Sequence, residues 1–268
     1  MRFFTDTHCH LDFEALSQDL NATLNRAAKS NVTTIVVPSI GPTNWQDVLN
    51  LPSKYQGIQI MPCLGLHPWF LANTSLQTLE RLRALIIENL NRLPAIGEAG
   101  IDGKIAEEQG NLSWQIEVFE YQLALANEVK KPIIVHHRKS HPKIAESFKR
   151  VKPEYGGVIH AFSGSFQQAK TYLDLGFKIG IGGTITYERA AKTINTVKKL
   201  PLESLVLETD APAMPLNGMQ GAPNEPQYIS KVFDALANIR EESRAALANQ
   251  IDVNARQLFS SLHDNLDG

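Results

Sequence analysis

Short runs of apolar and β-branched residues recur along the chain, and a stretch with apolar residues at three- and four-residue steps follows each run. The first pattern predicts buried strands, and the second predicts helices that lay an apolar stripe against a sheet. The eight predicted strands are Arg2–Thr7, Val32–Pro38, Ile58–Leu64, Ala95–Gly97, Pro132–Val135, Gly157–Ile159, Lys178–Ile181 and Leu205–Leu207. Helical periodicity marks Leu76–Arg92 and Leu112–Lys130, and Pro226–Leu262 has the pattern of two amphipathic helices.

Eight strand–helix units in 268 residues match a (β/α)8 TIM barrel in both count and length. A doubly wound open sheet is the alternative, but no G-x-G-x-x-G segment follows the first predicted strand. No linker or low-complexity run interrupts the pattern. We therefore predict an α/β fold, a (β/α)8 TIM barrel, as a single domain over residues 1–268.

Charge and cysteine content narrow the class of protein. A net charge of −2 excludes a basic field over the whole surface, so a nucleic-acid substrate would need local positive charge, such as bound metal. The two cysteines, Cys9 and Cys63, lie in apolar segments, which indicates free thiols in a reducing compartment. No apolar run approaches the roughly 18 residues that span a bilayer. The expectation is a soluble cytoplasmic protein with no membrane partner.

Titratable side chains gather where the predicted strands end. The residues at these positions are His8, His10, His67, Glu98, His136, His160 and Asp210. In a TIM barrel the carboxyl ends of the strands converge on one mouth, where active sites of this fold lie. We therefore expect all seven side chains to surround one point.

A metal centre explains this set better than separate structural roles. Residues two apart in an extended segment share a face, so His8 and His10 can hold one ion, whereas Cys9 turns away. By the same rule His136 and Arg138 share a face, and His137 turns outward. The alternatives are a hydrogen-bonded core histidine at His160 and a buried salt bridge at Glu98.

The ligand types indicate two divalent ions. Imidazole and carboxylate groups suit Zn²⁺ or Mn²⁺ better than an all-oxygen Mg²⁺ cage, although ligand type alone does not choose among Zn, Mn and Mg. Six of these side chains, four imidazoles and two carboxylates, are candidate ligands. A catalytic zinc takes three ligands from protein, so two ions are expected. The two oxygens of Glu98 allow it to bridge them.

Six segments, in order along the chain, resemble the TatD family of metal-dependent hydrolases. They are Asp6-Thr7-His8-Cys9-His10-Leu11-Asp12, Gly65-Leu66-His67-Pro68, Gly97-Glu98-Ala99-Gly100-Ile101-Asp102, His136-His137-Arg138, His160-Ala161-Phe162-Ser163-Gly164 and Glu208-Thr209-Asp210-Ala211-Pro212. The stretch Lys178–Tyr187, together with Met214–Gly218, is similar to the YjjV branch of that family. Ala99 and Ile101 replace other apolar residues of the family's pattern, which leaves the neighbouring ligand unchanged.

The resemblance implies a TIM-barrel hydrolase with two divalent metal ions, and DNase activity is described for some members of the family. Carried over by motif, the ligands are His8 and His10 for one metal, Glu98 as the bridge, His136 and His160 for the second, and Asp210 as the remaining acid.

Phosphodiester hydrolysis fits such a centre, because two ions can activate water and hold the leaving oxygen. We expect cleavage of DNA ends or short single-stranded nucleic acid, with Asp210 and Glu98 as catalytic residues. His67 and Arg138 are candidate substrate contacts; alternatively, His67 fixes a loop and Arg138 pairs with Glu208 or Asp102. The other functions left open are an amidohydrolase-type reaction on a C–N or ester bond and a non-catalytic, metal-stabilised binding protein.

Three loop segments near the predicted mouth each allow a functional and a structural interpretation. Trp69 and Phe70 follow His67-Pro68 and either stack on a nucleobase or pack within their loop. The Gly182-Gly183-Thr184 turn offers backbone N–H groups for phosphate or is an ordinary turn. The segment Met214–Pro226 is either a lid over the site or a rigid crossing to the last helices.

Overall fold

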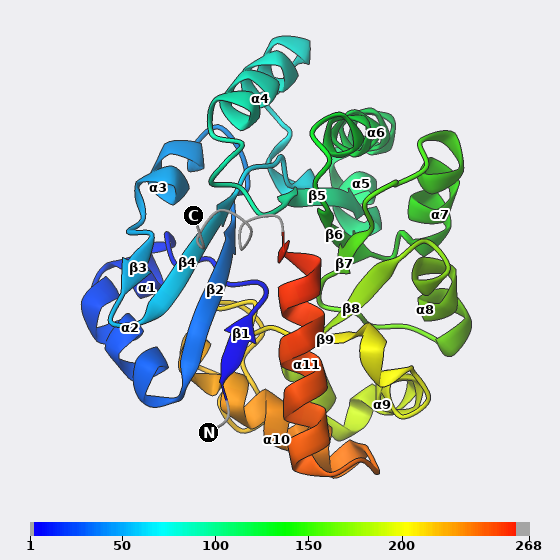
Figure 1. Cartoon of the computed structure of the whole chain (residues 1–268). Helices are drawn as coiled ribbons and strands as arrows, with labels where there is room; N and C mark the ends of the chain where they lie inside the picture. Colours follow the sequence, from blue (N-terminus) through cyan, green and yellow to red (C-terminus); the bar gives the residue numbers. More distant parts are fainter. Residues whose placement is uncertain (1–2, 261–268) are drawn as a thin grey trace.

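Eight parallel strands form a closed barrel in the computed structural model, which describes residues 3–260 (Figure 1). The parallel strands are β1 (Phe4–Asp6), β2 (Val32–Pro38), β4 (Ile58–Cys63), β5 (Ile96–Asp102), β6 (Ile133–Arg138), β7 (Gly157–Ile159), β8 (Phe177–Ile181) and β9 (Leu205–Leu207). The short β3 (Lys54–Tyr55) pairs with β4 in antiparallel fashion. The TIM-barrel prediction is confirmed.

Two seams close the barrel. At the first, the Gly97 N–H donates to the Leu64 carbonyl at 2.9 Å and joins β5 to the end of β4. At the second, the Thr7 N–H donates to the Leu207 carbonyl at 3.0 Å, just beyond β1. The bond from the His10 N–H to the Ala211 carbonyl, 2.8 Å long, extends this second seam to the mouth. The chain immediately after β1 and β9 is therefore held side by side.

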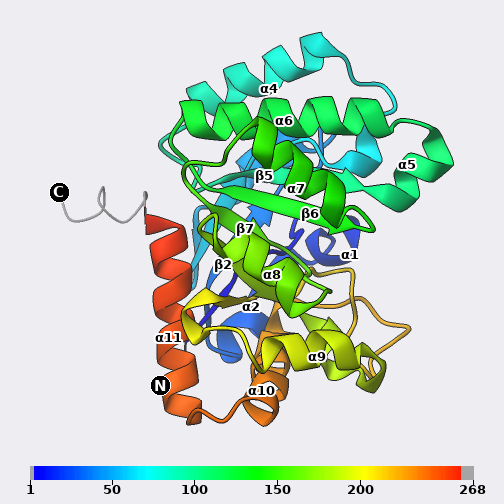
Figure 2. The same cartoon turned by 90° about the vertical axis from the view of Figure 1, so that its right-hand side faces the viewer.

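Helices cover the outside of the barrel (Figures 1 and 2). They are α1 (Glu14–Ser17), α2 (Leu20–Lys29), α3 (Trp45–Asn50), α4 (Leu76–Glu88), α5 (Gly103–Gln109), α6 (Leu112–Glu128), α7 (His141–Arg150), α8 (Phe166–Leu173), α9 (Ala191–Val197), α10 (Ile229–Ile239) and α11 (Arg244–Leu258). Short 3₁₀ turns are η1 (Pro68–Phe70), η2 (Gly183–Thr186), η3 (Glu188–Ala190), η4 (Leu202–Ser204) and η5 (Pro226–Tyr228). None of the helices within residues 3–260 is long and apolar enough to cross a membrane.

Alternation along the strands builds two apolar layers. In β2, Val36 packs in a small cluster inside the barrel, whereas Ile35 and Val37 belong to the large cluster under the helices. Ala255 and Phe259, at the end of α11, close the small cluster from below. Figure 2 shows α11 on one side of the barrel and α5 on the other, so the bottom is plugged and the opposite mouth is left for chemistry.

The sequence predicted the bounds of β2, β7 and β9 and ended two other strands too early. The fourth predicted strand, Ala95–Gly97, corresponds to β5, and the fifth, Pro132–Val135, extends to Arg138 as β6. Glu98 therefore lies within its strand instead of closing it, and all seven residues of β5 are buried. Polar side chains stay in these strands because partners in the mouth satisfy them.

The other predicted elements are present with shifted ends: α4 stops four residues and α6 two residues before the predicted ends, and β1, β4 and β8 differ from prediction by one or two residues at an end. The predicted helices Leu76–Arg92 and Leu112–Lys130 appear as α4 and α6, and α10 and α11 are the two C-terminal helices. The predicted bounds Arg2 and Leu262 fall outside the described residues. Cys9 and Cys63 are free thiols and both are buried.

Candidate metal centre

The seven side chains predicted at the mouth converge on one place. Six of them line a pocket of about 470 Å³, and His8 is fully buried beside them. His8 and His10 follow β1, His67 follows β4, Glu98 lies in β5, His136 lies in β6, His160 follows β7 and Asp210 follows β9. A barrel is what allows residues so far apart in sequence to share one pocket.

Glu98 stands at the centre, and its two oxygens face different partners. Oε2 lies 3.1 Å from His8 Nε2 and 3.6 Å from His10 Nε2. Oε1 lies 3.1 Å from both His136 Nδ1 and His160 Nε2. The carboxylate therefore divides these four histidines into two pairs, which we name the His8/His10 half and the His136/His160 half. A fifth histidine, His67, places Nε2 3.2 Å from Oε1, on the side of the His136/His160 half.

Asp210 belongs to the His8/His10 half. Its Oδ1 atom lies 3.6 Å from His8 Nε2 and 3.8 Å from His10 Nε2. The Asp210 N–H donates to the His8 carbonyl at 2.8 Å, so the closing seam of the barrel places this carboxylate. Burial raises the pKa of Asp210 to about 7.

The protonation of these groups suits a metal. Burial, with His160 nearby, holds the pKa of His8 well below its usual range, and burial lowers the pKa of His10 to about 4. Burial alone would raise the pKa of Glu98, but the surrounding histidines, His67 first, hold it well below its usual range. Neutral His8 and His10 beside an ionised Glu98 are forms that bind cations. Burial alone would lower the pKa of His136 and of His160, but the carboxylates beside them raise both, so these two rings must release protons when an ion binds.

Three geometric facts show that the residues fit divalent ions. His8 Nε2 and His10 Nε2 approach to 3.2 Å, so their lone pairs converge on one point. The His10 Nδ1–H donates to the Pro38 carbonyl at 3.1 Å, which leaves Nε2 unprotonated in the neutral ring. The candidate ligand atoms of His8, His10 and Glu98 lie within 4.8 Å of one another. Nitrogen and carboxylate donors in this number are typical of transition-metal sites.

A carboxylate that sequence reasoning missed supports His136. Asp102 Oδ2 lies 3.0 Å from His136 Nε2 and accepts the Trp69 indole N–H at 2.7 Å. Its other oxygen accepts the N–H groups of Lys104 and Ile105 and caps α5. The available signal was its position four residues after Glu98 in an extended segment, which places both on one face.

The candidate substrate contacts occupy different positions. His67 is buried, with Nε2 3.2 Å from Glu98 Oε1. Arg138 lines the pocket as an exposed side chain, and within residues 3–260 no ion pair joins it to Glu208 or Asp102. The pairing proposed as its alternative role is therefore not what the structure shows. His137 turns toward Phe162, with ring centroids 5.7 Å apart.

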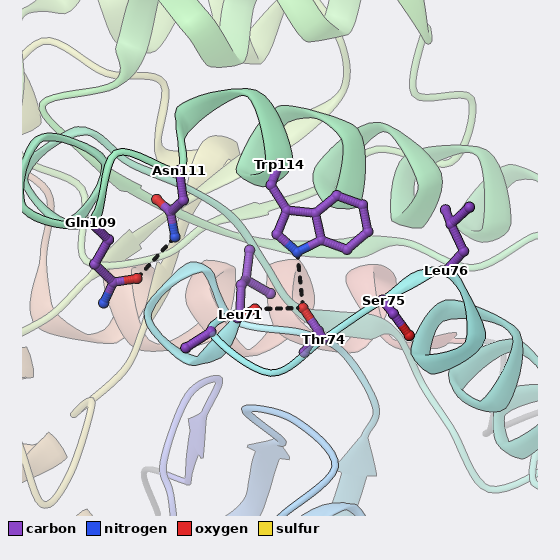
Figure 3. Close-up of a pocket in the computed structure, with 8 residues that line it drawn as sticks. Leu71, Thr74, Ser75, Leu76, Gln109, Asn111 and Trp114 are labelled. Carbon is purple, nitrogen blue, oxygen red and sulfur yellow. Dashed lines mark hydrogen bonds between the residues drawn. The ribbon is translucent and has the colours of Figure 1, made fainter.

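The rim of the mouth is aromatic on one side. Trp69 and Phe70, in η1, are 42% and 44% exposed and line the pocket. An open groove of about 770 Å³ begins just beyond them, between residues 71–76 and the start of α6 (Figure 3). The Trp114 indole N–H spans it to Thr74 Oγ1 at 2.9 Å. None of the described residues that line this groove is ionisable, so the chemistry belongs to the pocket.

The loop after β9 is tied at its base. The side chain of Asn224 donates to the Thr209 carbonyl at 2.8 Å and to the Met214 carbonyl at 3.2 Å. Met214 lines the pocket and is 39% exposed. One buried amide thus connects the two ends of the segment that borders the site.

Comparisons with known proteins agree with this geometry. A sequence profile of the family described as TatD related DNase matches residues 5–260. The chain is 43% identical to the uncharacterized metal-dependent hydrolase YjjV of Escherichia coli, over 96% of this chain and 98% of that one. The crystal structure of that protein superposes with a TM-score of 0.91. The 3'-5' ssDNA/RNA exonuclease TatD of Pantoea ananatis is 31% identical, over 95% of this chain and 98% of its own.

Proposed function

The chain belongs to the TatD related DNase family and is a metal-dependent hydrolase; from this premise we propose that it is a phosphodiesterase that removes nucleotides from the ends of short or single-stranded nucleic acid. The division of the histidines by the two oxygens of Glu98 carries the proposal. Two ions on one carboxylate suit an in-line displacement at phosphorus. The exonuclease named among the relatives supports the choice of substrate.

The proposed ligands follow the two halves. His8, His10 and Asp210 would hold one divalent ion and His136 and His160 the second, with Glu98 between the two sets. Bound ions of this kind polarise a phosphoryl oxygen and lower the pKa of water toward neutrality. Zn²⁺, Mn²⁺ and Mg²⁺ are the ions to test.

Asp210 is the proposed proton acceptor. A general base must lie within reach of the water that it deprotonates, and Asp210 lines the pocket beside the His8/His10 half. Its carboxylate can orient the attacking water, take its proton and pass that proton to the leaving oxygen. Glu98, with its pKa held low, stays ionised throughout.

His67 and Arg138 are the proposed substrate contacts. The Trp69 N–H donates to His67 Nδ1 at 3.1 Å, so neutral His67 carries its proton on Nε2, toward the centre. This Nε2–H faces Glu98 Oε1 at 3.2 Å, in contrast to the unprotonated Nε2 of His10, so His67 would contact substrate by turning this donor from Glu98. Arg138, exposed at the pocket wall, has the planar fork that suits a phosphate.

The test is cleavage of a single-stranded oligonucleotide and of bis(p-nitrophenyl) phosphate with Mg²⁺, Mn²⁺ or Zn²⁺. Asp210→Asn should reduce turnover by about 10²–10⁴-fold, the contribution typical of a general base. Asp174→Asn is the control, because Asp174 is an exposed acid whose ion-pair partner is Lys170 on α8. Undiminished cleavage by Asp210→Asn would remove its assigned role. Failure of the metal-loaded wild type on both substrates would reject the phosphodiesterase and favour an amide or ester substrate.

A further inference from the structure

A further buried carboxylate lies at the metal centre and, like Asp102, is not among the proposed ligands. Glu208 precedes Asp210 by two residues and has no solvent exposure. Within residues 3–260 no lysine or arginine forms an ion pair with it; its one ionic neighbour is His160, whose Nδ1 lies 3.5 Å from Oε1. A charge in such a place is costly unless it serves a partner.

The fold builds a niche for this side chain. The Ala161 N–H donates to Oε1 from a residue whose φ of 46° is unusual for alanine. Gly180, in β8, lies against Oε2, and a methyl group there would collide with it. Gly182 is more distant, since a Cβ there would contact Glu208 Cγ at an ordinary 3.5 Å.

Three buried polar atoms of the described residues around this niche are unpartnered. His8 Nδ1, His160 Nδ1 and Glu208 Oε2 have no hydrogen-bond partner among the described residues. The rings of His8 and His160 are stacked, with centroids 3.8 Å apart and planes 15° apart. Ligand atoms of His8, His160 and Glu208 lie within 4.8 Å of one another. His8 and His160 each turn Nε2 toward Glu98, one on each oxygen.

We propose that Glu208 is a positioning residue shared by the two halves of the metal centre, where it keeps the protons of His8 and His160 on Nδ1. A neutral imidazole whose Nδ1 carries the proton presents the lone pair of Nε2. Carboxylate partners of this kind orient ligating histidines and make them more basic. Because His8 and His160 belong to different halves, one buried charge supports both ions. This inference rests on the proposed two-metal centre and not on the identity of the substrate.

The experiment measures metal binding rather than turnover. Glu208→Gln keeps the shape and removes the charge, and we expect both metal positions to weaken by about 10- to 100-fold, as for other partners of ligating histidines. Competition with a chromogenic chelator gives the affinities, and elemental analysis gives the count. Glu117→Gln, on the exposed face of α6, is the matched control.

A spectroscopic measurement separates positioning from mere packing. In the Zn²⁺-loaded wild type, ¹⁵N resonances of His8 and His160 should show protonated Nδ1 and unprotonated Nε2. Glu208→Gln should shift both Nδ1 signals and leave those of His141 unchanged. Unchanged signals, or affinities within twofold of wild type at both positions, would overturn the inference. Weakening of the His136/His160 half alone would overturn the shared role.

Gly180→Ala reaches the same carboxylate without changing its charge, and it provides the test if Glu208→Gln does not fold. The new methyl group must displace Oε2, so metal affinity should fall, whereas Gly182→Ala should bind metal normally. Equal affinities in the two alanine variants would contradict the proposal. A wild type that binds fewer than two ions would instead refute the two-metal centre, so the two failures are distinguishable.

Discussion

The ring nitrogen of His136 that points away from Glu98 is Nε2, and it contacts the carboxylate of Asp102. The ring nitrogen of His10 that points away from Glu98 is Nδ1, and it contacts a peptide carbonyl. Asp102→Asn keeps the size of the partner but removes its charge, so the basicity of His136 should fall. We expect metal affinity in the His136/His160 half to decrease by about 10- to 100-fold, measured by chelator competition. The His8/His10 half should be unaffected.

Asp102 also caps α5, so the stability of the metal-free variant must be measured as a control. An asparagine still caps a helix N-terminus, so α5 and the unfolding temperature of the metal-free protein should change little. A large loss of metal-free stability with normal metal affinity would mean that Asp102 serves the helix and not the metal.

His141 gives a pH prediction away from the centre. Burial lowers the pKa of this histidine, and its Nδ1 is hydrogen-bonded to the Tyr172 hydroxyl at 2.7 Å. In the unfolded state His141 begins to bind a proton near pH 6.5, whereas in the folded state it binds one only at lower pH. The contribution of His141 to the free energy of unfolding is therefore fully present above pH 6.5 and is lost as the pH falls. The stability advantage of wild type over His141→Phe should therefore shrink between pH 7.5 and 5, measured by urea unfolding. A constant difference would contradict the assignment.

Residue identity alone indicated which side chains meet, but not which atoms do. Strand-end position was sufficient to bring Glu98, His136 and Asp210 to one pocket. It could not show that Asp102 contacts His136 from behind, because that contact depends on ring orientation. Nor could it show that Gly180 makes room for Glu208, since the two are distant in sequence.

Among the elements, the 3₁₀ turn η1 connects the aromatic rim of the pocket to the candidate metal centre. Trp69→Ala removes an exposed ring, and we expect the KM for a single-stranded oligonucleotide to rise about 5- to 150-fold, the equivalent of about 1–3 kcal/mol of stacking. An oligonucleotide with an abasic terminal residue should show a much smaller change. Steady-state kinetics on both substrates measure the difference.

Two variants control for other roles of this side chain. Trp69→Phe keeps a ring but loses the N–H bond to Asp102, so it should retain most of the oligonucleotide affinity. Tyr155→Ala removes an aromatic ring that is 41% exposed and does not line the pocket. Equal effects of Trp69→Ala on the normal and abasic substrates would exclude stacking.

Element bounds were predictable where hydrophobicity changes at the strand end, as in β2 and β7. They were not predictable in β5, which contains Glu98 and ends in Asp102, or in β6, which ends in three polar residues, although these strands remain paired: Gly100 pairs with His136 and Asp102 with Arg138. A pattern of apolar residues detects a strand only as far as its neighbours are apolar. Strands that carry polar functional residues are therefore predicted to be shorter than they are.

For the whole molecule, the count of strand–helix units was enough to predict the barrel, because eight units of this length close in one common way. The plug formed by α11 was not predicted as such. The periodicity of Arg244–Leu258 indicated a helix, but its place depends on Phe259 and Ala255 meeting the interior cluster around Val36 and Val206. Tertiary contacts of this kind have no local signature.

The separation of plug and mouth leads to a prediction for metal removal. The apolar clusters lie within the barrel and under the helices, so the metal-free chain should stay folded, with an unchanged far-ultraviolet circular dichroism spectrum. An ion whose free concentration is 100 times its dissociation constant raises the free energy of unfolding by about 2.7 kcal/mol. A chelator should therefore lower the Tm by about 5–11 °C per ion, at the roughly 2–4 °C per kcal/mol typical of this size. Glu98→Gln, which lacks the charge facing both halves, should show almost no chelator-dependent shift. A wild-type Tm that stays constant while two ions are removed would place the ions outside this pocket.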